Sequence, residues 1–247
     1  MQSVKGRGQA SILRPKGMPV NRLLRSLAAG AALVAAAPGV HAQDADQEAA
    51  WRNAPGVDAV GVADRVYGPA KADFSLIVWL DPECPYCRQI GAMPERVVEA
   101  ANGRLNLAVR LYPLPFHGAN AMIASASALC VADQTGADGF YRFLDGYLAM
   151  TGANGKGLPG TEADGVVALA RAAGARDGQA LTTCSHDNAT AQRLSAEMKA
   201  ADRAGISGTP TFAIRNNRTG ETLMAEGALA ETDVKAAVNA MASRAGG

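Results

Sequence analysis

Alternating apolar and polar stretches predict the elements of a first structural half. Phe74 to Leu80 is a nearly continuous apolar run, which is typical of a strand buried on both faces. From Cys84 to about Ala101, apolar residues recur at helical spacing, and Asn102-Gly103 ends that helix. Leu105 to Leu111 alternates and predicts a second strand. Together these segments predict a β-α-β unit whose helix begins at a pair of cysteines.

The second half of the chain follows a different pattern. Residues from about 117 to 204 are Ala-rich and helical in pattern, interrupted by a glycine-rich connection from Gly152 to Gly160, and they predict a helical insertion. Strands are then expected at Thr211 to Arg215 and Leu223 to Glu226, followed by a helix from about Glu231 to Ser243. A β-α-β half and a ββα half separated by helices predict an α/β fold with a four-stranded mixed sheet and flanking helices.

The start of the chain is typical of a secretory signal peptide. Residues 1–42 carry six basic side chains and no acidic one, and the apolar run from Leu27 to Ala37 is shorter than the roughly 20 residues that span a bilayer. We expect cleavage before Gln43, with translation starting at Met1 or Met18. A retained amphipathic anchor is disfavoured because the run is Ala-rich all round.

The remaining chain divides into a lead-in segment, residues 43–70, and one domain, residues 71–247. The lead-in has too little apolar content for a domain, with one short strand expected around Ala59 to Val66. Removing six of the 24 basic side chains and none of the 23 acidic ones changes the formal charge from +1 to −5 (18 minus 23), which argues against a nucleic-acid partner. All four cysteines lie after residue 42, so two disulfides are expected in an oxidising compartment.

Cys84-Pro85-Tyr86-Cys87 carries the candidate chemistry. The first turn of a helix presents unpaired N–H groups and the positive end of the helix dipole, which stabilise a thiolate. Cys84, nearer the helix end, is therefore predicted to attack, and Cys87, one turn in, to resolve the mixed disulfide. Pro85 and Tyr86 lie between them, and Tyr86 is expected to tune access and to contact substrate.

Two other roles for this pair are disfavoured. A zinc site needs four ligands, and Cys130 and Cys184 are single cysteines without a second close pair or a His cluster, so no metal is expected. A structural disulfide between Cys84 and Cys87 would close too small a loop to constrain the unfolded chain.

Thr209-Pro210 precedes a predicted strand, where a trans proline is awkward unless it marks a tight turn or a sheet edge. We expect a cis peptide bond at Pro210; a plain strand-entry proline is the alternative.

The segments Asp81 to Gln89 and Gly205 to Pro210 resemble those of periplasmic Dsb proteins, specifically the DsbC/DsbG isomerase branch, over roughly residues 71–245. The resemblance implies a thioredoxin-like fold with Cys84 as nucleophile and Cys87 as resolving partner. It also implies that Thr209 and cis-Pro210 form a loop beside the dithiol that offers backbone to an extended substrate.

In that branch, residues placed like Cys130 and Cys184 can form a second, structural disulfide, and a bridge across 54 residues (184 minus 130) is expected to stabilise by up to about 4 kcal/mol. A second redox pair is the alternative, disfavoured because neither cysteine belongs to a local motif.

The sequence departs from the branch in two ways. Only 41 residues, 43–83, separate the expected cleavage site from Cys84. Dimerisation through a preceding domain is therefore not expected, and we expect a monomer. Val78 stands where many thioredoxin-like proteins keep a buried carboxylate that moves protons for the resolving cysteine; Glu83 or water is a candidate substitute. Glu83 and Arg88 are expected on a solvated rim. His117 is left outside the catalytic set, as a loop or helix-entry residue.

The sequence therefore predicts a periplasmic thiol–disulfide oxidoreductase or isomerase that exchanges disulfides with exported proteins through Cys84 and Cys87. A membrane thiol redox partner is expected, and no cofactor. Two alternatives remain: a monomeric DsbA-like thiol oxidant, and a non-catalytic chaperone or binding module on a thioredoxin scaffold. A peroxide-reducing enzyme is disfavoured because nothing beyond the cysteine pair suggests a peroxide pocket.

Overall fold

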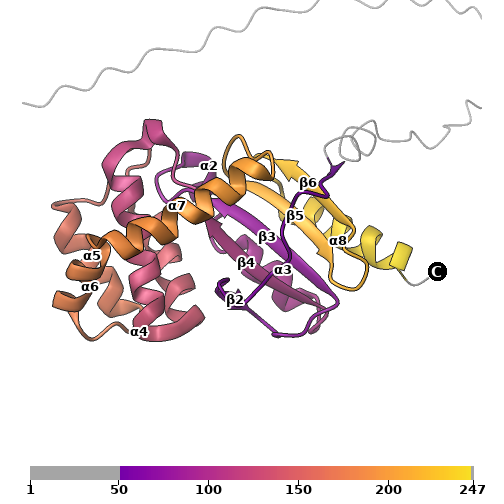
Figure 1. Ribbon diagram of the computed structural model, residues 1–247, viewed down its shortest axis with the longest axis horizontal. Coiled ribbons are helices and arrows are strands. Elements are labelled where there is room, and N and C mark those ends of the chain that lie inside the picture. Colours follow the sequence, from indigo (N-terminus) through magenta and orange to yellow (C-terminus); the bar gives the residue numbers. More distant parts are fainter. Residues whose placement is uncertain (1–50, 246–247) are drawn as a thin grey trace, which may run out of the picture. The chain divides into compact units, whose positions relative to one another are not determined.

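The computed structural model of the protein describes residues 51–245 (Figure 1). The expected signal peptide and the first residues of the lead-in segment lie outside the described residues. Six strands form one sheet in the order β1-β6-β5-β3-β4-β2. The strands are β1 (Arg52–Asn53), β2 (Val66–Tyr67), β3 (Phe74–Leu80), β4 (Leu105–Leu111), β5 (Thr211–Asn216) and β6 (Thr222–Glu226).

Helices and one short 3-10 turn connect and cover these strands. They are α2 (Pro85–Ile90), α3 (Met93–Ala100), η1 (Pro115–His117), α4 (Gly118–Met150), α5 (Glu162–Ala172), α6 (Gly178–Ser185), α7 (Asn188–Arg203) and α8 (Glu231–Ala245). No helix among residues 51–245 is both long and apolar enough to cross a membrane.

Strand β3 is the centre of the sheet because its side chains are apolar on both faces. It pairs in parallel with β4 and antiparallel with β5, and all seven of its residues are buried. Leu76 and Val78 belong to the large core that includes residues of α3, α4 and α8, whereas Ile77 and Trp79 belong to a second core with Ala201 of α7. The predicted α/β fold with a mixed sheet, flanking helices and a helical insertion is confirmed.

The insertion shares its core with the sheet. Helix α4 has 33 residues with a kink at Gly136, where φ is +72°. Phe140, Phe143 and Tyr147 of α4 are fully buried in the same apolar cluster as β3. This shared packing fixes α4 relative to the end of β3, where the cysteine pair begins.

The helix expected from Cys84 to about Ala101 is two helices. Gly91, between α2 and α3, has φ +46°, a conformation that L side chains rarely adopt, and Pro94 lies in the first turn of α3. The apolar period continues across the break, which is why the sequence pattern did not show it.

The strand expected around Ala59 to Val66 is wrong for most of its length. Only Val66 is in a strand, β2, and the lead-in adds another strand, β1, at the opposite edge of the sheet. Asp64 accepts a hydrogen bond from the Gly61 N–H and pairs with Arg110, so a turn held by side chains replaces the strand.

Candidate functional site

The cysteine pair lies at the start of α2, directly after the central strand. Cys84 is the N-cap residue with extended backbone, Pro85 occupies the first turn, and the Cys84 carbonyl accepts the Arg88 N–H. A proline suits this position because its fixed φ is helical and its missing N–H would have no partner there. Both cysteines are free thiols; Cys84 is 3% exposed and Cys87 is fully buried, so the reachable sulfur belongs to Cys84. Tyr86, between them, is 61% exposed.

The loop before β5 meets this dithiol. The Thr209–Pro210 peptide bond is cis, as expected. The Cys84 Sγ lies 3.2 Å from the Thr209 carbonyl oxygen, to which it donates a hydrogen bond when it is protonated, although the two residues are 125 positions apart. The structure thus brings Cys84, Cys87, Thr209 and Pro210 together.

The electrostatic environment separates the two thiols. A hydrogen bond from the Cys87 thiol lowers the pKa of Cys84 to about 6; burial opposes this, and the Thr209 side chain and the backbone N–H groups of Tyr86 and Cys87 lower it further. The Thr209 hydroxyl is buried and has no other partner, so it is available to the sulfur. Burial, followed by the interaction with Cys84, raises the pKa of Cys87. At neutral pH the site favours a thiolate on Cys84 and a proton on Cys87.

Asp81 organises the turn between β3 and the cysteines. Its Oδ1 accepts the Glu83 N–H at 2.8 Å, and its backbone carbonyl accepts the Cys84 N–H at 3.1 Å. Its Oδ2 lies 2.7 Å from the Leu114 nitrogen, which donates, and 2.6 Å from His117 Nδ1. Burial raises the pKa of Asp81, and these hydrogen bonds partly offset that rise. The carboxyl therefore connects the backbone of Glu83, directly before Cys84, with the start of the insertion.

His117 belongs to this arrangement and, as expected, is a helix-entry residue: it ends η1 and is the N-cap residue of α4. It is 4% exposed, and its ring Nδ1 lies 2.6 Å from Asp81 Oδ2. Sequence spacing gave no signal for the contact, because 36 positions separate the two residues.

The expectation for Glu83 is wrong. Instead of lying on a solvated rim, Glu83 is fully buried, and its side chain accepts hydrogen bonds from Tyr147, Thr151 and the Gly157 N–H. Arg88 is exposed, as expected. Val78 is buried among apolar residues, whereas Asp81 and Glu83, within three positions of Cys84 in the chain, are fully buried carboxyl groups.

A family profile described as "Thioredoxin" matches residues 61–242, which includes the dithiol and the cis-proline loop. This chain belongs to the thioredoxin family. With its free cysteine pair at a helix start, it is a thioredoxin-like thiol–disulfide oxidoreductase.

Solved structures of the same fold are similar to this thioredoxin-family chain. DsbA2 of Pseudomonas aeruginosa has 29% sequence identity and a TM-score of 0.63, with 74% of this chain and 97% of that chain covered. A thioredoxin-like oxidoreductase from Silicibacter pomeroyi DSS-3 has 22% identity and a TM-score of 0.59, covering 74% and 94%. Oxidised BdbD from Bacillus subtilis has 14% identity and a TM-score of 0.60, covering 72% and 91%. No curated protein sequence matches the chain. The similarity to the DsbC/DsbG branch is not confirmed; the DsbA-type structures fit better.

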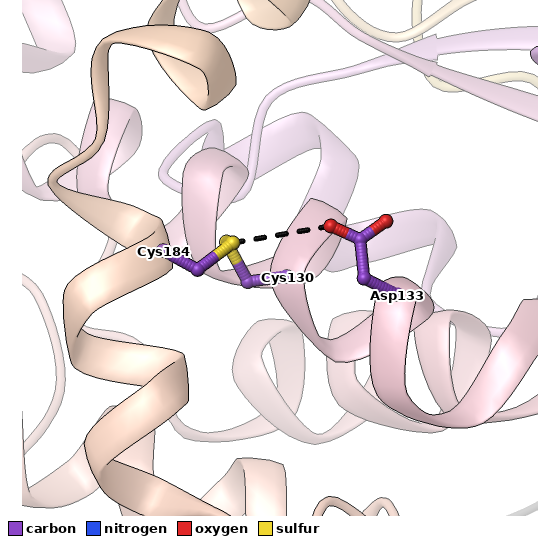
Figure 2. Close-up of side chains that lie close together, drawn as sticks. All are labelled: Cys130, Asp133 and Cys184. Carbon is purple, nitrogen blue, oxygen red and sulfur yellow. Dashed lines mark hydrogen bonds between the residues drawn. A yellow bond between two sulfur atoms is a disulfide. The ribbon is translucent and has the colours of Figure 1, made fainter.

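The other two cysteines of this thioredoxin-family protein are joined. Cys130 of α4 and Cys184 of α6 form a disulfide with a Cα–Cα distance of 5.9 Å (Figure 2). Thr190 Oγ1 lies 3.4 Å from the Cys184 sulfur, and Asp133 Oδ2 lies 3.9 Å from it. Asp133 also pairs with Arg193 of α7, so the bridge and the ion pair together connect α4, α6 and α7.

Among residues 51–245, the one cluster of potential metal ligands is Cys130, Asp133 and Cys184. Its two sulfurs are bonded to each other, and the third group is already paired with Arg193. The donor set therefore does not fit a metal ion in this oxidised state.

Replacing both Cys130 and Cys184 with alanine is expected to lower the free energy of unfolding by up to about 4 kcal/mol, because a bridge spanning 54 positions restricts the unfolded chain. Urea denaturation of the double variant and of the parent measures the loss. Disulfide-exchange activity should survive under conditions where the variant is folded. An equal stability of the two proteins would contradict a structural role, and loss of activity from a folded variant would favour a second redox pair.

Proposed function

We propose that this protein is a DsbA-like oxidant that donates a Cys84–Cys87 disulfide to exported proteins in the periplasm. The observation that carries the proposal is the position of Cys84 as the N-cap residue of α2, beside the Thr209 loop and one turn from the Cys87 thiol, which lowers the pKa of Cys84. A stabilised Cys84 thiolate stabilises the reduced form, and a more stable reduced form makes the disulfide a stronger oxidant.

The reaction follows from which sulfur is reachable. A substrate thiolate attacks Cys84 Sγ, the Cys84–Cys87 bond breaks, and Cys87 leaves and takes up a proton. A second substrate thiolate then attacks the substrate sulfur of the mixed disulfide, and Cys84 leaves as a thiolate. The substrate loses two electrons to form its disulfide, and the protein gains them as a dithiol. Because a low-pKa thiol is the better leaving group, the second step is fast for Cys84.

Exposed aromatic side chains at the start of α2 and at the start of the insertion support a polypeptide substrate. Tyr86 is exposed next to Cys84, and Phe116, one residue before the buried His117, is 77% exposed. Apolar rings around a reactive sulfur are suited to unfolded chains, which expose apolar side chains. The backbone of the Thr209–Pro210 loop is proposed to pair with the extended substrate backbone.

The similarity to DsbA-type structures supports the proposed direction of the reaction. Of the three structures described above, DsbA2 of Pseudomonas aeruginosa has the highest sequence identity to this chain, 29%. We propose accordingly that the chain acts as a monomer, that residues 1–42 direct it to the periplasm, and that a membrane thiol oxidant restores its disulfide.

A paired assay tests the proposal. The oxidised protein is mixed with a reduced peptide containing two cysteines, and separately the reduced protein is mixed with a scrambled multi-disulfide protein. We expect rapid oxidation of the peptide and little recovery of the scrambled protein. Efficient recovery with slow peptide oxidation would instead identify an isomerase, and inactivity in both assays would favour a binding module.

A further inference from the structure

The Tyr147 hydroxyl lies between two carboxyl groups beside the dithiol. Its Oη is 2.8 Å from Glu83 Oε1 and 2.7 Å from Glu162 Oε1. A phenol has one proton to donate, and an ionised carboxylate only accepts. Both contacts can be hydrogen bonds only if, besides the phenol proton, one of the two carboxyl groups carries a proton.

The surrounding donors indicate which carboxyl carries it. Glu83 is fully buried and accepts from Tyr147, from the Thr151 hydroxyl and from the Gly157 N–H, a set that suits an anion. Glu162, which is only half-buried, accepts the Leu158 N–H at its Oε2, so its Oε1 is the atom left to donate to Tyr147. Burial, followed by the contacts with both carboxyls, holds the pKa of Tyr147 well above its usual value, so the phenol keeps its own proton.

This network fastens the glycine-rich loop to the residue before Cys84. The Gly157 N–H donates to Glu83 Oε2 at 3.1 Å, and the Asn154 N–H donates to the Glu83 carbonyl at 2.7 Å. Gly157 has φ +72°, and a Cβ there would lie 2.4 Å from Glu162 Oε2. The loop backbone is thus packed directly against both carboxyl groups, with no room for a side chain.

We propose that Glu83 and Glu162 share one proton through Tyr147, and that this contact positions the loop of residues 151–160 against the backbone beside Cys84. This inference rests on the proposed thiol exchange only where it predicts an effect on the rate of peptide oxidation. Glu83, Tyr147 and Glu162 are positioning residues, since they act through the loop and the Cys84 backbone.

Loss of the shared proton should open the contact. Two carboxylates would then face one phenol oxygen, and one of them would meet a lone pair instead of a hydrogen. In the unfolded chain a glutamate has lost its proton above about pH 5, so the native state binds one proton more and the stabilisation falls as pH rises. Other titratable or charged groups near the network are Cys84 of α2, Lys156 of the loop, Asp164 of α5 and His186 of α6.

Glu162→Gln is the decisive variant, because its amide reproduces a permanently protonated carboxyl. The Gln Nε2 can donate to Tyr147, and its Oε1 can accept the Leu158 N–H. In the full-length protein, hydrogen exchange of the Gly157 and Leu158 amides is measured at about pH 6 and about pH 9 and corrected for the intrinsic rate. We expect protection in the parent to fall about tenfold or more at the higher pH and to stay constant in Glu162→Gln.

An infrared difference spectrum of the parent at neutral pH should contain a protonated-carboxyl band that Glu162→Gln lacks. Tyr147→Phe, which removes both contacts, should leave the loop unprotected at both pH values. The proposal is overturned if the parent has no such band, or if Glu162→Gln and the parent lose protection equally at high pH.

The rate of peptide oxidation gives a second readout. The ratio of rates at the two pH values should differ between the parent and Glu162→Gln, whereas a purely structural role would leave that ratio unchanged. If the band and the protection behave as expected but no peptide is oxidised, the proposed function fails and the shared proton stands. If peptide oxidation is normal and the band is absent, the shared proton fails alone.

Discussion

Replacing Cys84 with alanine is expected to reduce the oxidation of a dithiol peptide to the uncatalysed background. Cys84 carries the reachable sulfur and the lowered pKa, whereas Cys87 is fully buried, so no second sulfur can take its place. Stopped-flow fluorescence of the peptide measures the rate. Cys87→Ala, mixed instead with a peptide that contains a disulfide, should accumulate a mixed disulfide with that peptide. The Cys84 thiolate attacks one peptide sulfur, the other peptide sulfur leaves as a thiolate, and no Cys87 is present to resolve the bond; the product is seen as a mass increment that a reductant removes.

The matched control is the double variant of Cys130 and Cys184, which lacks the other disulfide and keeps the active pair. It should oxidise the peptide at the parental rate when folded. Circular dichroism establishes that Cys84→Ala is folded. A folded Cys84→Ala protein that still oxidises the peptide would exclude the dithiol mechanism; if it instead keeps only a cellular function, the binding-module reading is favoured.

The second large effect is in the pH dependence of the reduced protein. Alkylation of Cys84 by iodoacetamide should reach half its maximal rate near pH 6, the pKa of this thiol, whereas an ordinary cysteine titrates near pH 8.5. At about pH 7 roughly nine-tenths of Cys84 would be thiolate, against a few per cent for an ordinary cysteine. The intrinsic nucleophilicity of a low-pKa thiolate is smaller, which reduces but does not cancel this advantage.

The same shift makes stability depend on pH. The folded pKa of Cys84 lies below the unfolded value, so the thiolate contributes stability to the reduced protein above the unfolded pKa, and this contribution is lost as pH falls towards about 6. From about 9 to about 6, the shift corresponds to a contribution on the order of 4 kcal/mol at most. Urea denaturation of the reduced protein across this range measures it, with the oxidised protein, which has no thiolate, as the reference.

Cys87→Ala is the informative comparison, because the hydrogen bond from the Cys87 thiol is the main cause of the lowered pKa. In that variant the half-maximal pH of alkylation should move up towards the ordinary value. A parental midpoint near pH 8.5 would contradict the thiolate argument and, with it, the proposed oxidising strength.

Local patterns were sufficient to predict the four central strands and the dithiol, but not the short edge strands β1 and β2. Strands β3 and β4 begin and end at the predicted residues, and β5 and β6 differ from the prediction by one residue each. These strands were predictable because a buried strand has a short run of apolar residues in the sequence. Cys84 and Cys87 were found because a helix start and a two-residue spacing are properties of neighbouring residues. The lowered pKa of Cys84 follows largely from the Cys87 thiol one turn away.

The tertiary structure decided which distant groups surround that pair. Glu83 meets Tyr147 across 64 positions, Asp81 meets His117 across 36, and Cys84 meets Thr209 across 125. No spacing in the sequence encodes these contacts, because they depend on how α4 and the loop before β5 pack against the end of β3. The sequence therefore predicts that Glu83, next to a cysteine, is solvated. It is buried instead, because the insertion supplies its hydrogen-bond donors.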